Sequence, residues 1–233
     1  MASVASVTPI VALDVGSTGA ALEIVDILGD LCGFYKVGGE LFTSEGPSVV
    51  RTLRQRSVSV FLDLKFHDIP NTVRGAVRSA ATLGASLLTV HASGGAAMLE
   101  AAAEGARDTG CELLAVTVLT SLSSEALGSA WGRPISDMES EVLRLATLAF
   151  DAGFHGVVCS GREVAAVRSA YGSRLATLVP GVRLGGDATQ DQARVVTPRA
   201  AAEAGARYVV LGRAVTAAES PRDAMNLVLA DLS

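Results

Sequence analysis

The sequence contains very little lysine. It has 19 cationic residues, and only Lys36 and Lys65 among them are Lys; all the others are Arg. Arg keeps its proton at any pH near neutrality, whereas the surroundings of a Lys ammonium can adjust it to give its proton up. A chain that uses Arg almost everywhere else makes both of its lysines candidates for chemistry.

Cysteine and long apolar runs are also scarce. Cys32, Cys111 and Cys159 are far apart, each in an apolar stretch, and their spacing is not that of a metal site. We therefore expect reduced, buried thiols, as in a cytoplasmic protein. No apolar run approaches the ~20 residues that span a membrane, and the N-terminus lacks the basic segment of a signal peptide. The expectation is a cytoplasmic protein that does not associate with membranes.

Charge of either sign is limited. Charged residues make up 18% of the chain, hydrophobic residues make up 49%, and the net charge is -5 at pH 7. This composition fits a compact protein. The negative balance argues against general binding of nucleic acids, which requires a basic face. It is compatible with a small anionic substrate, because a few local cations can outweigh the overall charge.

Short apolar runs alternate with Ala-rich helical stretches along the chain. The runs are almost continuously apolar, as in strands that are buried on both faces. Pro47, Pro198 and Pro221 mark helix starts, and Ser136–Glu139 has the pattern of a capping box. Strands are predicted at Ile10–Asp14, Gly33–Val37, Val58–Leu64, Leu87–His91, Leu113–Leu119, Gly156–Cys159, Ala176–Val179 and Tyr208–Leu211.

Eight strands that are each followed by a helix form either a closed barrel or a doubly wound sheet. No GxGxxG motif follows the first strand, which disfavours a dinucleotide-binding sheet. The length of 233 residues is close to the roughly 250 typical of (β/α)8 barrels. No linker or low-complexity tract divides the chain. The sequence therefore predicts an α/β protein with a single (β/α)8 (TIM) barrel domain over residues 1–233.

Polar groups recur where the predicted strands end. In barrels of this kind the catalytic groups lie at the carboxyl ends of the strands, on one face. One or two such groups would be ordinary solvated strand ends, but groups after the first four strands and again after the last two indicate an active site. The set consists of Asp14, Lys36, Asp63, Lys65, His91, Thr120, Arg183, Gly212 and Arg213.

The densest cluster follows the third strand. Asp63 and Lys65 are two residues apart, so a regularly extended strand would direct both side chains to the same side. Asp68 follows the strand, just before Pro70 begins the next helix. Carboxylates beside a lysine stabilise its charged form. A D-x-K-x-x-D motif here, with the other lysine at a neighbouring strand end, indicates catalysis more strongly than a structural ion pair.

The last two loops predict a phosphate site. Barrels often bind phosphate with the loops after strands seven and eight and with the start of a short helix. Gly212 permits close approach of the backbone, and Arg183 and Arg213 supply donors. The glycine-rich segment 181–187 is either a mobile surface loop or a loop that closes over a ligand.

The sequence has two other features outside this pattern. His67 and His91, with the nearby aspartates, could surround Mg²⁺ or Zn²⁺, but two lysines would then place positive charge in the same pocket. We therefore expect no metal. Segment 121–134, which contains Trp131, has no functional signal and is expected to be a loop between helices.

The sequence FLDLKFHDIPNT at Phe61–Thr72 resembles the signature of the orotidine 5'-phosphate decarboxylase family. That resemblance implies a homodimeric (β/α)8 barrel that converts orotidine 5'-phosphate to UMP in pyrimidine biosynthesis, without metal or organic cofactor. Similar segments follow in the same order along the chain: VALD at 11–14, KVG at 36–38, VHASGG at 90–95, AVTVLTS at 115–121, GVVCS at 156–160, PGVR at 180–183 and LGRAVT at 211–216.

The resemblance also implies residue roles. Lys65 would donate the proton within an alternating charged array completed by Lys36, Asp63 and Asp68. Asp68 and Thr72 would reach into the site of the partner subunit. Asp14 and Lys36 would bind the ribose hydroxyls and Thr120 would lie beside the pyrimidine. The phosphate would be held by Gln192, Arg183, Gly212 and Arg213. Gly39 departs from the family pattern, which leads us to expect a longer side chain there.

Two other functions remain as alternatives. The first is a Mg²⁺-dependent sugar-phosphate decarboxylase or aldolase of the same barrel group, whose members typically have Glu where this chain has Lys36. The second is a barrel that binds a phosphate ligand without catalysis. The second is disfavoured because every expected charged position is occupied.

Overall fold

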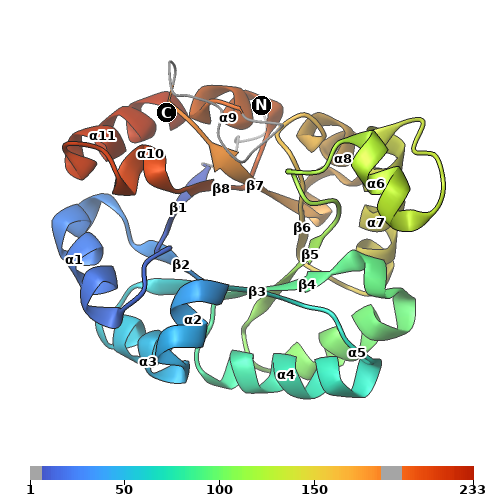
Figure 1. Cartoon of the computed structure of the whole chain (residues 1–233), viewed down its shortest axis with the longest axis horizontal. Helices are drawn as coiled ribbons and strands as arrows, with labels where there is room; N and C mark the ends of the chain where they lie inside the picture. Colours follow the sequence, from blue (N-terminus) through green and yellow to red (C-terminus); the bar gives the residue numbers. More distant parts are fainter. Residues whose placement is uncertain (1–6, 185–195) are drawn as a thin grey trace.

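Eight parallel strands close into a barrel in the order β1 to β8, and β8 pairs with β1 (Figure 1). The computed structural model describes residues 7–184 and 196–233. The closed barrel confirms the predicted fold and excludes the doubly wound sheet. The strands are β1 (Thr8–Ala12), β2 (Phe34–Gly38), β3 (Ser59–Phe66), β4 (Leu87–His91), β5 (Glu112–Val116), β6 (Gly156–Val158), β7 (Ala176–Val182) and β8 (Tyr208–Leu211).

Helices surround the barrel as an outer ring (Figure 1). Short 3-10 helices lie at η1 (Gly29–Leu31), η2 (Ala92–Gly94) and η3 (Gly172–Arg174). The α-helices are α1 (Thr18–Leu28), α2 (Gly39–Glu45), α3 (Pro47–Gln55), α4 (Pro70–Thr82), α5 (Ala96–Ala106), α6 (Ser124–Trp131), α7 (Met138–Asp151), α8 (Val164–Tyr171), α9 (Pro198–Ala204), α10 (Arg213–Thr216) and α11 (Pro221–Leu232). Within the described part of the chain, no helix is long and apolar enough to cross a membrane.

The predicted helix starts are mostly confirmed. Pro47, Pro198 and Pro221 each lie in the first turn of a helix. The capping box over Ser136–Glu139 was wrong, because Asp137 is the residue that caps α7. Its carboxylate accepts hydrogen bonds from the backbone N–H groups of Glu139 and Ser140.

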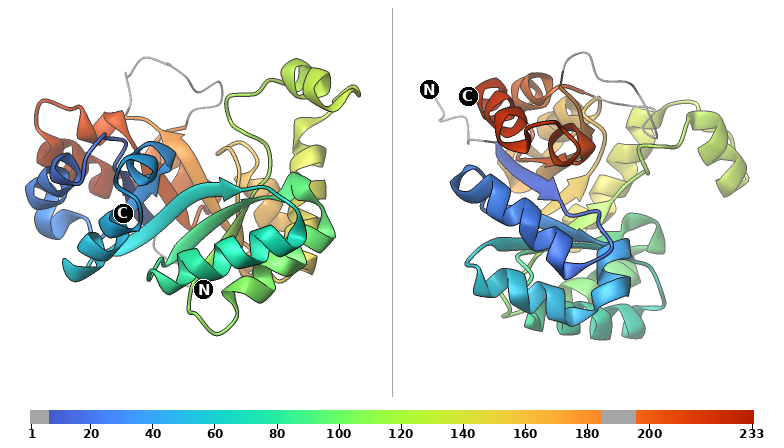
Figure 2. Two further views of the ribbon diagram at one scale, coloured as in Figure 1. Left: turned by 60° about the horizontal axis from the view of Figure 1, so that its bottom comes forward. Right: turned by 60° about the vertical axis from the view of Figure 1, so that its left-hand side comes forward.

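The segment 121–134 also differs from the prediction of a plain loop. It contains helix α6, which projects away from the barrel (Figure 2). Trp131 ends this helix, and the guanidinium carbons of Arg133 and Arg144 lie 5.4 Å and 6.0 Å from the centroid of its ring. Both arginines also pair with the buried carboxylate of Glu141. The indole thus has a structural place that the sequence did not reveal.

The apolar residues form two layers, as a barrel with outer helices requires. One layer fills the barrel interior and includes Ile10, Phe61 and Leu114. The other joins the outer face of the strands to the helices. Cys32, Cys111 and Cys159 are buried thiols, as predicted. Because burial disfavours the thiolate, it raises the pKa of Cys111 to about 12, so this thiol is neutral at physiological pH.

Candidate active site

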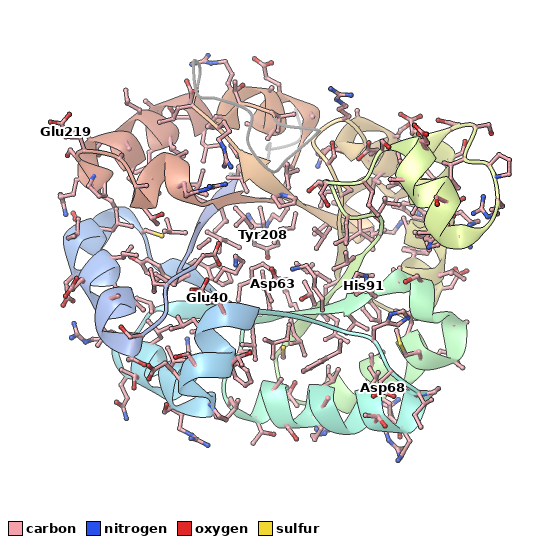
Figure 3. All side chains as sticks on the ribbon, in the orientation of Figure 1. Glu40, Asp63, Asp68, His91, Tyr208 and Glu219 are labelled. Carbon is pink, nitrogen blue, oxygen red and sulfur yellow. The ribbon has the colours of Figure 1, made fainter. Side chains whose placement is uncertain are left out.

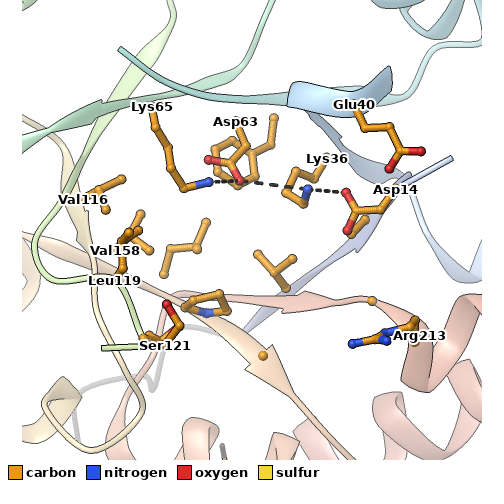
Figure 4. Close-up of a pocket in the computed structure, with 18 of the residues that line it drawn as sticks. Asp14, Lys36, Glu40, Asp63, Lys65, Val116, Leu119, Ser121, Val158 and Arg213 are labelled. Carbon is orange, nitrogen blue, oxygen red and sulfur yellow. Dashed lines mark hydrogen bonds and ion pairs between the residues drawn. The ribbon is translucent and has the colours of Figure 1, made fainter. Parts of the chain in front are cut away.

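A cavity of about 580 Å³ opens at the carboxyl ends of the strands (Figure 4). Its size suits a small-molecule ligand. Its apolar floor comes from inward-facing strand residues: Ala12, Phe61, Val116, Val158, Leu178 and Val210. Its polar lining includes most of the residues predicted from the sequence: Asp14, Lys36, Asp63, Lys65, Thr120, Arg183, Gly212 and Arg213. The strand-end pattern therefore identified this face correctly.

Four of these side chains form a row of alternating charge, which we call the charged row: Asp14, Lys36, Asp63 and Lys65 (Figure 4). Lys65 Nζ lies 2.7 Å from Asp63 Oδ2. Lys36 Nζ lies 3.9 Å from the same Asp63 oxygen and 2.7 Å from Asp14 Oδ1. Each ammonium thus lies beside at least one carboxylate.

Burial differs along the charged row. The Lys36 and Asp63 side chains are only 11% and 13% exposed, whereas Lys65 is 37% and Asp14 58% exposed. The middle of the row is therefore fixed away from solvent and its ends open towards the cavity. The predicted array had Asp68 at one end. Within the described chain, the carboxylate that completes the row is Asp14.

The backbone that carries Asp63 and Lys65 is not regularly extended. Strand β3 pairs with β4 through Leu62 and Leu88, and then through Phe66 and Val90. Three β3 residues therefore face a single β4 residue, which is a bulge. Lys65 has a φ of 48°, in the left-handed region. Both side chains reach the cavity as predicted, but through this bulge and not through the simple alternation of a strand.

The β4 residue opposite the bulge is Thr89, which sequence reasoning missed. The backbone N–H of Lys65 donates a 2.9 Å hydrogen bond to Thr89 Oγ1, and that hydroxyl lies 2.8 Å from Asp63 Oδ1. Thr89 is fully buried. The available signal was a polar residue inside the otherwise apolar run LLTV.

The predicted phosphate residues lie on the other side of the cavity. Arg213 faces it across from Asp63 (Figure 4). Arg213 begins helix α10, directly after Gly212. Arg183 follows β7, and its backbone N–H donates to the carbonyl of Val196. Gln192 lies outside the described residues.

Asp68 and Thr72 are not brought to this cavity. Both are exposed, and Asp68 Oδ1 accepts a 2.6 Å hydrogen bond from the N–H of Ile69. Figure 3 shows Asp68 beside α4 and α5, away from Asp63 at the barrel centre. Their predicted place in a partner subunit's site therefore stays a prediction.

The two histidines near the motif lie close to each other. The rings of His67 and His91 have centroids 5.5 Å apart. Burial, followed by electrostatic interaction with His67 and Lys65, lowers the pKa of His91, and the Asp63 carboxylate opposes the shift. Among residues 7–184 and 196–233, no three His, Cys, Asp or Glu side chains gather as metal ligands.

Comparison with known proteins agrees with this geometry. A model of the "Orotidine 5'-phosphate decarboxylase / HUMPS family" matches residues 8–228. The chain is 47% identical over 230 residues to orotidine 5'-phosphate decarboxylase of Moorella thermoacetica, with 96% of this chain and 91% of that protein covered. It is 51% identical over 223 residues to the enzyme of Anaeromyxobacter sp. (strain K), with 95% and 96% covered.

Solved structures show the same similarity. The crystal structure of orotidine 5'-phosphate decarboxylase from Lactobacillus acidophilus superposes with a TM-score of 0.85 at 36% identity, covering 97% of this chain and 99% of that chain. The match therefore extends over the whole barrel and not only over the motif at the end of β3. By sequence and by fold, this chain belongs to the orotidine 5'-phosphate decarboxylase / HUMPS family.

Proposed function

We propose that this protein decarboxylates orotidine 5'-phosphate to UMP in pyrimidine biosynthesis, and is thus a carboxy-lyase. The observation that carries the proposal is the charged row, whose Lys65 ammonium extends into an apolar-floored cavity. The named relatives, about half identical over nearly their full length, support the same activity.

The substrate spans the cavity. Arg183, Gly212 and Arg213, together with Gln192, bind the phosphate, because guanidinium groups and a helix start suit a phosphate dianion. Asp14, at the exposed end of the charged row, and the neighbouring Lys36 bind the ribose hydroxyls. Thr120 lies beside the pyrimidine. Binding energy gained at the phosphate then aligns the ring with Lys65.

The chemistry requires a fixed cation at the reacting carbon. The bond between the ring carbon and its carboxylate breaks, CO2 leaves, and the electron pair stays on the ring carbon with no adjacent π system to delocalise it. The Lys65 ammonium stabilises this charge and then transfers a proton to the carbon. Because Asp63, which is itself paired with Lys36, already holds this ammonium in place, little reorganisation is needed during the reaction.

Asp68 and Thr72 act in the neighbouring subunit of a homodimer. Both are exposed around the start of α4 and away from their own cavity. Ile69, between them in sequence, is a large apolar residue that is 67% exposed, and in the proposed homodimer the partner covers it. Asp68 of one subunit then completes the charged row of the other.

The decisive test is an absorbance assay with orotidine 5'-phosphate, run before and after exhaustive chelation of divalent metals. We expect loss of the substrate absorbance at the same rate in both. No loss of absorbance would contradict the proposed reaction and favour a non-catalytic barrel. Activity that disappears on chelation and returns with Mg²⁺ would favour the metal-dependent members of this barrel group.

A further inference from the structure

We propose that Thr89 is a positioning residue for the decarboxylation, because its hydroxyl fixes both the Asp63 carboxylate and the backbone of Lys65. The inference rests on the proposed function of the charged row. Thr89 lines no part of the cavity, so it acts through its two neighbours and not on the substrate.

The bulge in β3 creates the need for such a residue. Between the Leu62–Leu88 and Phe66–Val90 pairs, three residues of β3 face only Thr89 of β4. The regular ladder cannot supply an acceptor for every N–H group in this stretch. The N–H of Lys65 donates instead to the Thr89 hydroxyl, at 2.9 Å. A side chain thus replaces a missing backbone partner.

The direction of each hydrogen bond follows from the chemistry of the groups. A backbone N–H can only donate, so Thr89 Oγ1 accepts from Lys65. The single hydroxyl proton is then free to donate to Asp63 Oδ1, 2.8 Å away. Thr89 is fully buried, so no water competes for either bond. The hydroxyl therefore holds both partners at once.

This arrangement divides the Asp63 carboxylate between two functions. Oδ1 accepts from Thr89, and Oδ2 faces Lys65 at 2.7 Å and Lys36 at 3.9 Å. Rotation of the carboxylate would break the Thr89 bond, so the oxygen that holds the lysines stays in place. The same hydroxyl supports the left-handed backbone of Lys65, a conformation that side-chain-bearing residues rarely adopt.

Removing only the hydroxyl tests this inference. Thr89→Val keeps the shape and leaves the Lys65 N–H and Asp63 Oδ1 without their partner. We expect kcat to fall on the order of 100-fold, the effect of a misplacement of about 1 Å at a reacting group. KM and the affinity for UMP should change little, because the phosphate residues lie across the cavity. Thr89→Ser keeps the hydroxyl and should restore kcat to within a few-fold of wild type.

The matched control is Thr117→Val. Thr117 is also buried, and its hydroxyl donates at 2.8 Å to the carbonyl of Val158, not to the charged row. This variant should lose stability but retain kcat.

If Thr89→Val does not fold, Thr89→Cys compared with Thr89→Ser gives the same contrast, because a thiol is a weak hydrogen-bonding group.

The outcomes are distinct. A folded Thr89→Val protein with wild-type kcat would overturn the inference, as would equal losses in the Ser and Val variants. A loss of UMP affinity that matches the loss of kcat would also overturn it, because it would indicate general damage to the site. A wild-type protein that binds UMP but does not decarboxylate orotidine 5'-phosphate would refute the proposed function itself, before any variant is compared.

Discussion

The ammonium of Lys36 lies 2.7 Å from Asp14 Oδ1, in the space that a side chain at position 38 would fill. A Cβ on Gly38 would lie 2.8 Å from Lys36 Nζ and 3.2 Å from that Asp14 oxygen. The glycine that ends β2 therefore makes room for one end of the charged row.

Gly38→Ala should reduce activity while leaving the fold intact. The displaced group is the free end of a lysine, so the structure can adapt, but the Lys36–Asp14 pair must shift. We expect kcat/KM to fall by about 10-fold or more, since small displacements of positioned groups are costly. The free energy of unfolding should change by less than about 1 kcal/mol. Steady-state kinetics and urea denaturation measure the two quantities.

The neighbouring glycine provides the control. A Cβ on Gly39 would meet nothing within 4 Å. Gly39→Ala should therefore retain wild-type kcat/KM, in line with the longer side chain that the family pattern leads us to expect there. Equal losses of kcat/KM in Gly38→Ala and Gly39→Ala would show that crowding of Lys36 does not cause the loss of activity.

Lys65→Ala should separate binding from chemistry. The variant removes the proposed proton donor but leaves Arg183 and Arg213 in the cavity. Turnover should fall by several orders of magnitude, and UMP affinity, measured by calorimetry, should change little. Lys36→Ala should instead weaken binding as well, because Lys36 is also a proposed ribose ligand. Near-normal turnover of Lys65→Ala would contradict the proposed mechanism.

The proposed sharing of sites between subunits predicts complementation. In a mixed dimer of Lys65→Ala and Asp68→Ala chains, one site has both substitutions and the other has neither. Random mixing of the two inactive variants should therefore restore about a quarter of the wild-type activity, because half of the dimers are mixed and each has one intact site. Native mass spectrometry verifies the mixed dimer. A verified mixed dimer without activity would place Asp68 outside the neighbouring site.

Much of the site followed from the sequence because its signals are local. Strand ends of a parallel barrel all meet at one face, so Lys36, Asp63 and Arg213 could be brought together without coordinates. Eight apolar runs, each followed by a helical stretch, left a closed barrel or a doubly wound sheet as the fold, and the absence of a GxGxxG motif favoured the barrel. β4 and β8 have the predicted bounds.

Most of the features that the sequence did not reveal depend on how neighbouring strands pair. The bulge opposite Thr89 is a shift of register between β3 and β4, and neither strand shows it alone. Asp14 was expected to bind ribose only, because its distance from Lys36 depends on how the loop after β1 lies against β2. Asp137 was missed as a helix cap because Ser136 also fits the capping pattern one residue earlier.

Stability should depend on pH through His91. Burial, His67 and Lys65 lower its pKa in the folded state, whereas an unfolded His titrates near pH ~6.5. As pH falls below ~6.5, the unfolded chain binds a proton that the folded chain does not, so the folded state loses stability until pH reaches the lowered pKa. His91→Gln should flatten the part of the stability curve that lies below pH ~6.5, measured by urea denaturation at fixed protein concentration. An NMR titration identifies the His91 signal by its loss in the variant. Titration of that signal at or above pH ~6.5, or parallel stability curves for both proteins, would contradict the prediction.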